Sequence, residues 1–256
     1  MKLRYLPFIT FALLCSSAQA FDLGGLKDQL KAAQNTAQPA PATSAANPAG
    51  LTGISKTDQV GSLKQALTQG AETAVASLAK ENGFLGNDKV RIPLPASLQK
   101  ADSLMRTLGM GKYADELTTS MNRAAEAAVP EAKTLLIGAV KSMTVQDAKA
   151  ILMGGNDSAT QYFRKNTEAA LTGKFKPIVN KSMQKVKFAE KYDQFAGQGV
   201  KLGVVDQQDA KLDDYITRKA MDGLFLMIAE QEKAIRANPM QAAGSLAQKV
   251  FSAIKF

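Results

Sequence analysis

The longest helical pattern in the chain covers residues 212–237, LDDYITRKAMDGLFLMIAEQEKAIRA. Within it, residues 223–229 are apolar on every side, which is typical of a helix buried inside a protein. Asp213 and Asp214 open the pattern, where negative charge suits the helix dipole, and Asn238-Pro239 closes it. We therefore predict a buried central helix about 39 Å long, at roughly 1.5 Å per residue.

Further helical patterns precede this one, because apolar residues recur there at three- and four-residue steps. They cover residues 60–78, 96–108 and 112–129, and a stretch after Pro130. The 112–129 pattern places on one face Tyr113, Leu117, Met121, Ala125 and Ala128. Thr144 and Asp147 have the spacing of a capping box, which predicts another helix start. A last amphipathic helix is expected to close the chain.

Residues 90–95, VRIPLP, interrupt the helical patterns, and we call them the strap. Pro93 and Pro95 are incompatible with a helix and with a central strand, so the strap is expected to be extended. Its Val, Ile and Leu side chains are expected to lie in a groove between helices. The predicted fold is all-α: a single helical domain of about eight to ten helices over residues 54–256, with one extended Pro-containing strap and a flexible tether before it.

The first twenty residues have the order of a secretory signal peptide. Lys2 and Arg4 precede an apolar run over 6–14, and residues 18–20, AQA, predict cleavage before Phe21. The run is shorter than the ~20 apolar residues that span a bilayer, so no transmembrane span is expected. A lipidated Cys15 is the weaker alternative, because the bulky Leu14 precedes it. We expect export, to the periplasm.

Residues 21–53 are predicted to be an N-terminal segment and a flexible linker. Within this range, residues 32–50 hold no large apolar side chain and are interrupted by prolines. Cleavage would leave 236 residues with 30 basic and 23 acidic side chains, and with neither His nor Cys. These absences exclude a Ser-His-Asp triad, a Cys-His pair, imidazole metal ligands and disulfides. We expect no metal site, no cofactor and no catalytic residue.

The first candidate binding site is Asn122, Arg123 and Glu126, whose three- and four-residue spacing places them on one flank of a helix. Pro130 cannot donate to the carbonyl of Glu126, which leaves that acceptor available. Arg123 would provide the fork of a polar clamp for an anionic or amide group. The alternative is structural, an interhelical ion pair beside closely packed alanines, since polar groups in such places usually satisfy one another.

The second candidate is a basic segment over residues 141–191, which holds ten Lys or Arg and four acids. Lys174, Lys181 and Lys185 share one helix face, provided that Pro177 lies near a helix start. Such a row could contact anionic lipid, phosphate groups or an acidic protein. Nucleic acid is not expected, because no recognition motif and no Trp accompany the lysines. The alternative is a solvated face that confers solubility.

Carboxylates provide the remaining catalytic possibility. A glycosidase-like hydrolase needs two carboxyl groups facing each other at ~5–9.5 Å across a cleft. Neighbouring residues on a helix point about 100° apart, so acids from two helices would have to converge. Asp213, Glu116 and Glu126 are the candidate acids of this alternative function.

Several segments together resemble a known family. They include the strap, residues 120–126 (SMNRAAE), residues 147–155 (DAKAILMGG) and residues 174–179 (KFKPIV). In this order they resemble domain-of-unknown-function family 4197, an uncharacterised family of exported bacterial proteins, over about residues 55–252. The resemblance implies an exported helical domain of Gram-negative bacteria. It implies no reaction and assigns no functional residues.

These observations favour binding over catalysis. We expect an exported cell-envelope protein that acts as a non-catalytic binding or protein-interaction module, with a carboxylate-dependent hydrolase lacking His and Cys as the alternative. The expected partner is an envelope protein or an anionic or amphipathic ligand, contacted by the strap region and the basic segment.

Overall fold

A computed structural model describes residues 53–107, 111–186, 205–242 and 244–253, together with a few separate residues between 189 and 203. Within these residues every regular element is a helix, which confirms the all-α prediction. The signal peptide and most of the linker lie outside the described residues, so both remain predictions. In the same described ranges, no helix is long and apolar enough to cross a membrane.

The helices follow one another with short connections. In chain order they are α2 (Lys56–Ala79), α3 (Ala96–Thr107), α4 (Lys112–Ala128), α5 (Ala132–Ser142), α6 (Val145–Met153), α7 (Ser158–Met183), α9 (Leu212–Ala237) and α10 (Ser245–Ala253). Short 3-10 turns join some of them: η2 (Val129–Glu131), η3 (Gln207–Asp209) and η4 (Pro239–Gln241). Pro130 therefore lies in the 3-10 turn between α4 and α5, where no backbone donor is lost from a helix interior.

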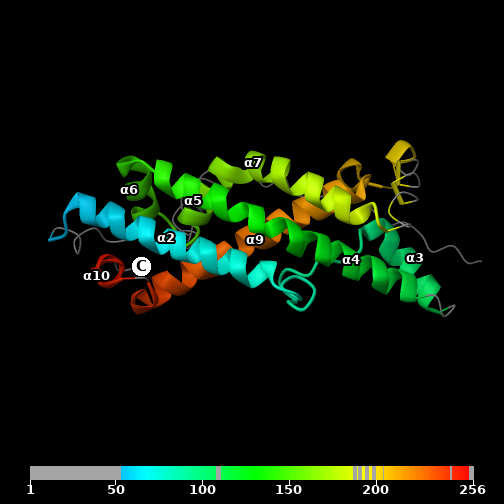
Figure 1. The fold of residues 1–256 in the computed structure, drawn as a ribbon, viewed down its shortest axis with the longest axis horizontal. Helices are drawn as coiled ribbons and strands as arrows, with labels where there is room; N and C mark the ends of the chain where they lie inside the picture. Colours follow the sequence, from blue (N-terminus) through cyan, green and yellow to red (C-terminus); the bar gives the residue numbers. More distant parts are fainter. Residues whose placement is uncertain are drawn as a thin grey trace, which may run out of the picture. The chain divides into compact units, whose positions relative to one another are not determined.

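Helix α9 is the central element of the fold. It packs against α7, α2 and α4, and Figure 1 shows it running alongside these three helices. The core on α9 includes Leu224 and Phe225, which are at most 1% exposed. The prediction that residues 223–229 are buried on all sides is wrong at Leu226, which is 41% exposed. Leu226 lies on the side of α9 that faces the strap.

Local sequence signals set most helix ends. The Ser55 hydroxyl accepts a hydrogen bond from the Asp58 amide at the start of α2, and Thr144 and Asp147 form the predicted capping box of α6. After α2, Asn82 adopts a left-handed φ of 62°. A Cβ on Gly83 would lie 2.3 Å from the Leu78 carbonyl oxygen, so only glycine fits this turn.

A buried ion pair joins three helices. The Glu232 carboxylate accepts hydrogen bonds from the Ala159 and Thr160 amides, both at 3.0 Å, and so caps the N-terminus of α7. Arg236 pairs with Glu232 at 2.8 Å and donates to the Ile151 carbonyl at the end of α6. Charges buried in this way are stable only when they are paired and hydrogen-bonded, so this contact fixes α6 and α7 on α9.

Two sequence expectations about helix faces are wrong. Tyr113 is 57% exposed and does not lie on the buried face of α4, which uses Leu117 and Met121 instead. Pro177 lies in the interior of α7 and not near its start, and α7 ends at Met183. Lys185 therefore follows the helix and does not continue its face.

The strap follows the prediction. Residues 91–95 adopt no helical turn, and the Val90, Ile92 and Leu94 side chains are buried. The segment lies between α4 and α9, because Ile92 bonds to α4 and Val90 lies close to Gly223 of α9.

Candidate functional site

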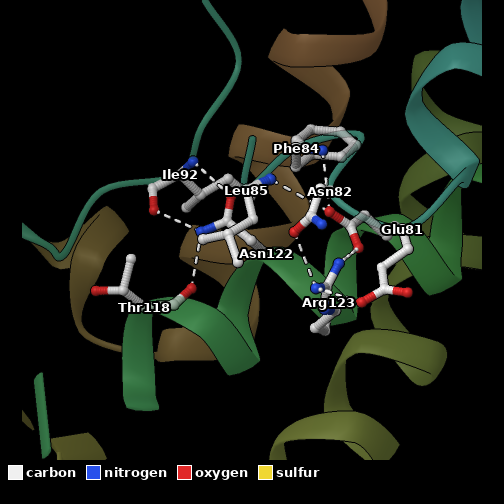
Figure 2. A network of polar contacts seen from close by, with 9 residues as sticks. Glu81, Asn82, Phe84, Leu85, Ile92, Thr118, Asn122 and Arg123 are labelled. Carbon is white, nitrogen blue, oxygen red and sulfur yellow. Dashed lines mark hydrogen bonds and ion pairs between the residues drawn. The ribbon is translucent and has the colours of Figure 1, made fainter. Parts of the chain in front are cut away.

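Asn122 on α4 holds the middle of the strap. Its side-chain oxygen accepts from the Ile92 amide at 2.8 Å, and its side-chain nitrogen donates to the Ile92 carbonyl at 2.9 Å (Figure 2). The same nitrogen also donates to the Thr118 carbonyl at 2.8 Å. Asn122 and Ile92 are both buried, so water cannot replace these bonds. A single amide side chain therefore satisfies both backbone groups of an extended residue inside the protein.

Glu126, one turn further along α4, holds the start of the loop before the strap. One of its carboxylate oxygens accepts from the Phe84 amide at 3.0 Å and from the Leu85 amide at 3.2 Å. The other oxygen pairs with Arg123 at 2.5 Å. Hydrogen bonds from two amides and a guanidinium stabilise the buried charge.

Arg123 extends this network toward the surface. Its guanidinium donates to the Asn82 side-chain oxygen at 2.9 Å and pairs with Glu81 at 3.1 Å (Figure 2). The hydrogen bond to Glu126, together with the charges of Glu126 and Glu81, raises the pKa of Arg123 above its ordinary value. The Glu81 side chain is 80% exposed. A ligand that contacts Arg123 directly would displace this outermost carboxylate.

The three predicted residues thus lie together, and their described partners are in α4 and in residues 81–92. The structural alternative expected an interhelical ion pair, but the pair of Arg123 and Glu126 lies within α4. Binding of an external ligand by this clamp remains a prediction. Its contacts within the chain position the loop and the strap.

Tyr215 of α9 also holds the strap, and no pattern in the sequence indicated this role. Its hydroxyl donates to the Pro93 carbonyl at 3.0 Å from the first turns of α9. Burial, together with the nearby Asp209 carboxylate, raises the pKa of Tyr215 to about 12. The phenol therefore stays protonated and can donate this bond at all ordinary pH values.

A groove lies between the strap and α9, and we call it the strap groove. It is lined by residues 89–93 and by Lys219, Asp222, Gly223 and Leu226 of α9, and has a volume of about 170 Å³. Lys219, Asp222 and Leu226 are spaced at i, i+3 and i+7, so they share one face of the helix. This spacing was visible in the sequence, but the strap that completes the groove lies about 130 residues earlier in the chain.

The predicted row of lysines is exposed. Lys174 and Lys181 lie on the outer surface of α7, Lys185 lies beyond its end, and none of the three forms an ion pair with a described residue. The neighbouring Lys176 is different, because it pairs with Asp214 of α9 at 2.5 Å. Asp214 raises the pKa of Lys176 through this bond. The unpaired lysines therefore give α7 and the turn that follows it a positive outer surface.

The acids of the hydrolase alternative have separate surroundings. Glu116 lies 3.7 Å from Lys112, Asp213 accepts from Asn180 at 3.2 Å, and Glu126 is held by the loop before the strap. Near Asp213, Asp193 accepts from the Leu212 amide, and burial raises the pKa of Asp193 above its ordinary value. Within the described part of the chain, no three acids, His or Cys are grouped so that they could hold a metal ion.

Comparison with known proteins gives one match. The family model described as "Protein of unknown function (DUF4197)" matches residues 53–252, which agrees with the resemblance over residues 55–252 in the sequence. No curated protein and no solved structure matches the chain.

Proposed function

We propose that this chain, which belongs to the DUF4197 family, is a non-catalytic binding module exported to the bacterial cell envelope. The strap groove is its binding face. In this proposal Asn122, Glu126 and Tyr215 position the strap, and the partner contacts the exposed residues on either side of the groove.

The observation that carries this proposal is the way the strap is held. Its backbone is bonded from α4 through Asn122 and from α9 through Tyr215, so an irregular segment that exposes Arg91 and Pro93 has a fixed conformation. Ordered irregular segments on a rigid helical scaffold are the usual position of binding residues. Arg91 and Lys219 flank the groove, and neither forms an ion pair with a described residue, so both can receive a partner.

Site-specific cross-linking tests the proposal. The photoreactive residue p-benzoylphenylalanine replaces Leu226 at the groove in the full-length protein, which is expressed in a Gram-negative bacterium that carries the gene. We expect a discrete adduct, seen by intact mass spectrometry or on a gel, that disappears when Arg91→Gln is added. The matched control places the same residue at Val145 on α6, which is 60% exposed and does not line the groove.

The same adducts from both positions, or an adduct at Leu226 that Arg91→Gln does not reduce, would contradict a binding face at the strap groove.

Export to the periplasm is tested separately. We expect the protein recovered from the periplasmic fraction to begin at Phe21, as N-terminal sequencing would show. A cytoplasmic protein that retains residues 1–20 would disprove export but would leave the binding face untouched.

A further inference from the structure

Close contact between α9 and the strap shapes the strap groove. A Cβ on Gly223 would lie 2.8 Å from the Phe84 ring and 3.2 Å from the Val90 Cβ, so the two segments meet at this glycine. On either side of it, Lys219 and Leu226 extend past the contact and line the groove. The groove is thus apolar where the two segments meet, and the charged side chains that line it form its rim.

The charges at the rim are not balanced. Lys89 pairs with Glu230 of α9 at 2.6 Å, which neutralises both. Arg91 and Lys219 remain, and no described carboxylate lies within ion-pair distance of either. Arg91 acts electrostatically on the Asp115 carboxylate, but Asp115 already pairs with Arg106.

One acid also lines the groove. Asp222 lies 3.6 Å from Arg164, and that arginine pairs more closely with Glu168, at 3.1 Å. Lining residues Arg91, Lys219 and Asp222 therefore leave a single surplus positive charge. A group with one negative charge matches this surplus, whereas a dianion would bring one negative charge more than the groove balances.

The size of the groove limits the ligand. Its volume of about 170 Å³ lies below the ~300–1,000 Å³ of most drug-sized ligand pockets. Arginine forms two parallel hydrogen bonds to a carboxylate, and Lys219 can add a third donor. Leu226, 41% exposed beside these cations, provides apolar surface for a hydrocarbon chain.

We infer that the strap groove binds a small monocarboxylate with a short apolar chain, held by Arg91 and Lys219 with its chain over Leu226. This inference rests on the proposed binding face and adds the chemical class of the ligand. The carboxylate of the ligand takes the place of an acidic partner for Arg91 and Lys219, and the hydrocarbon chain of the ligand leaves the groove past Leu226.

The test uses hexanoate as the probe, titrated into the mature protein labelled with ¹⁵N at low ionic strength. We expect saturable shifts of amide resonances in residues 89–91 and 219–226. Hexanol lacks the charge, and hexyl phosphate carries a second one. We expect each to bind at least tenfold more weakly than hexanoate.

Three variants locate the binding site. Arg91→Gln and Lys219→Gln should each weaken hexanoate binding at least tenfold, because each removes one of the two cations. Lys174→Gln removes the same charge from the outer surface of α7 and should leave hexanoate binding unchanged. All three positions are at least partly exposed, so the fold is expected to survive each change.

Several results would overturn the inference: no saturable shift with hexanoate, equal binding of hexanol, equal or tighter binding of hexyl phosphate, or binding that survives both groove variants. Binding of a peptide with a free C-terminal carboxylate but not of hexanoate would also overturn it. If hexanoate fails while the Leu226 cross-link still depends on Arg91, the ligand class is wrong and the binding face stands. If both fail, the proposed function falls as well.

Discussion

At the level of single residues, the strap depends on side chains that replace backbone partners. Asn122 acts as a neighbouring strand would, giving the Ile92 amide an acceptor and the Ile92 carbonyl a donor. Glu126 does the same for the Phe84 and Leu85 amides. Without these side chains an extended segment inside an all-helical protein would bury backbone groups with no partner, which is costly.

Replacement of Asn122 by alanine should therefore destabilise the protein strongly. It leaves the Ile92 amide and carbonyl buried without their partner, and each such group costs about 1–3 kcal/mol. We expect a loss of about 2–4 kcal/mol in the free energy of unfolding, measured by urea denaturation. The control is Asn166→Ala on the exposed side of α7, where the side chain bonds to the Tyr162 carbonyl of the same helix, with an expected change within about 0.5 kcal/mol. Equal effects of the two variants would show that Asn122 does not hold the strap.

Tyr215 makes stability depend on pH in the alkaline range. Its pKa is about 12 in the folded protein, against about 10 in an unfolded chain. Below pH 10 the phenol is neutral in both the folded and the unfolded state, so its contribution to the free energy of unfolding is fully present. As the pH rises from 10 to 12, the unfolded chain loses the proton first, so folding becomes less favourable by about 1.4 kcal/mol per pH unit.

The variant Tyr215→Phe isolates this contribution. At pH 8 it should be less stable than the native protein by about 1 kcal/mol, because it loses the hydrogen bond to Pro93. Above about pH 11 the order should reverse, since phenylalanine has no proton to lose. Urea unfolding at several pH values measures the difference, and Tyr113→Phe on the exposed side of α4 is the control. A difference that does not change with pH would contradict the burial of the Tyr215 phenol.

Spacing along a helix predicted which polar residues share the flank of α4, but it did not predict their partners. Asn122 and Glu126 bond to residues 30 to 42 positions away in the sequence. The helical repeat describes neighbours within about one turn and carries no information about such distant contacts. Tyr215 and Arg91 were missed for the same reason, because their importance appears only when the strap lies on α9.

At the level of elements, α9 shows how far periodicity determines packing. Its boundaries at Leu212 and Ala237 agree with the sequence prediction, since Asp213, Asp214 and Asn238-Pro239 are strong local signals. The apolar run on α9 predicted burial but not which face would remain uncovered. That face is fixed by the approach of the strap at Gly223, a tertiary contact that leaves Leu226 beside the strap groove.

Replacement of Gly223 by alanine should thus destabilise α9 despite the better helix propensity of alanine. The added Cβ would lie 2.8 Å from the Phe84 ring, and Phe84 is fully buried, so the strap or the ring must move. We expect a loss of about 1–3 kcal/mol in the free energy of unfolding, as for other overpacked sites. Thermal or urea unfolding measures it.

Gly138→Ala on α5 is the matched control. A Cβ there meets nothing within 4 Å, so helix propensity alone acts and should stabilise the protein by about 0.5–1 kcal/mol. If both glycine variants were stabilising, Phe84 and Val90 could not lie as close to Gly223 of α9 as the structure shows.

At the level of the whole molecule, composition predicted the class of fold and excluded several chemistries, but it did not predict the distribution of charge. The surplus of basic residues between 141 and 191 is partly neutralised in the folded chain, because Lys176 pairs with Asp214 and Arg164 with Asp222, both of which are acids of α9. These pairings depend on how α7 lies against α9. Lys174, Lys181 and Lys185 remain exposed and unpaired among the described residues, and they form a positive surface along α7 and just beyond its end.

This positive surface should bind anionic membranes electrostatically. A lysine near a charged bilayer contributes about 1 kcal/mol, so the triple replacement of Lys174, Lys181 and Lys185 by glutamine should weaken binding to phosphatidylglycerol vesicles at least tenfold at low salt. The control replaces the exposed Lys201, Lys233 and Lys249 by glutamine, which gives the same net charge. If retention depends only on net charge, both triple variants will weaken equally in a vesicle sedimentation assay. A loss of vesicle binding confined to the variant at 174, 181 and 185, together with weak binding of the native protein at high salt, would show that the position of the three lysines decides binding. Screened surface charges act only over about 10 Å, so lysines far from the contact contribute little.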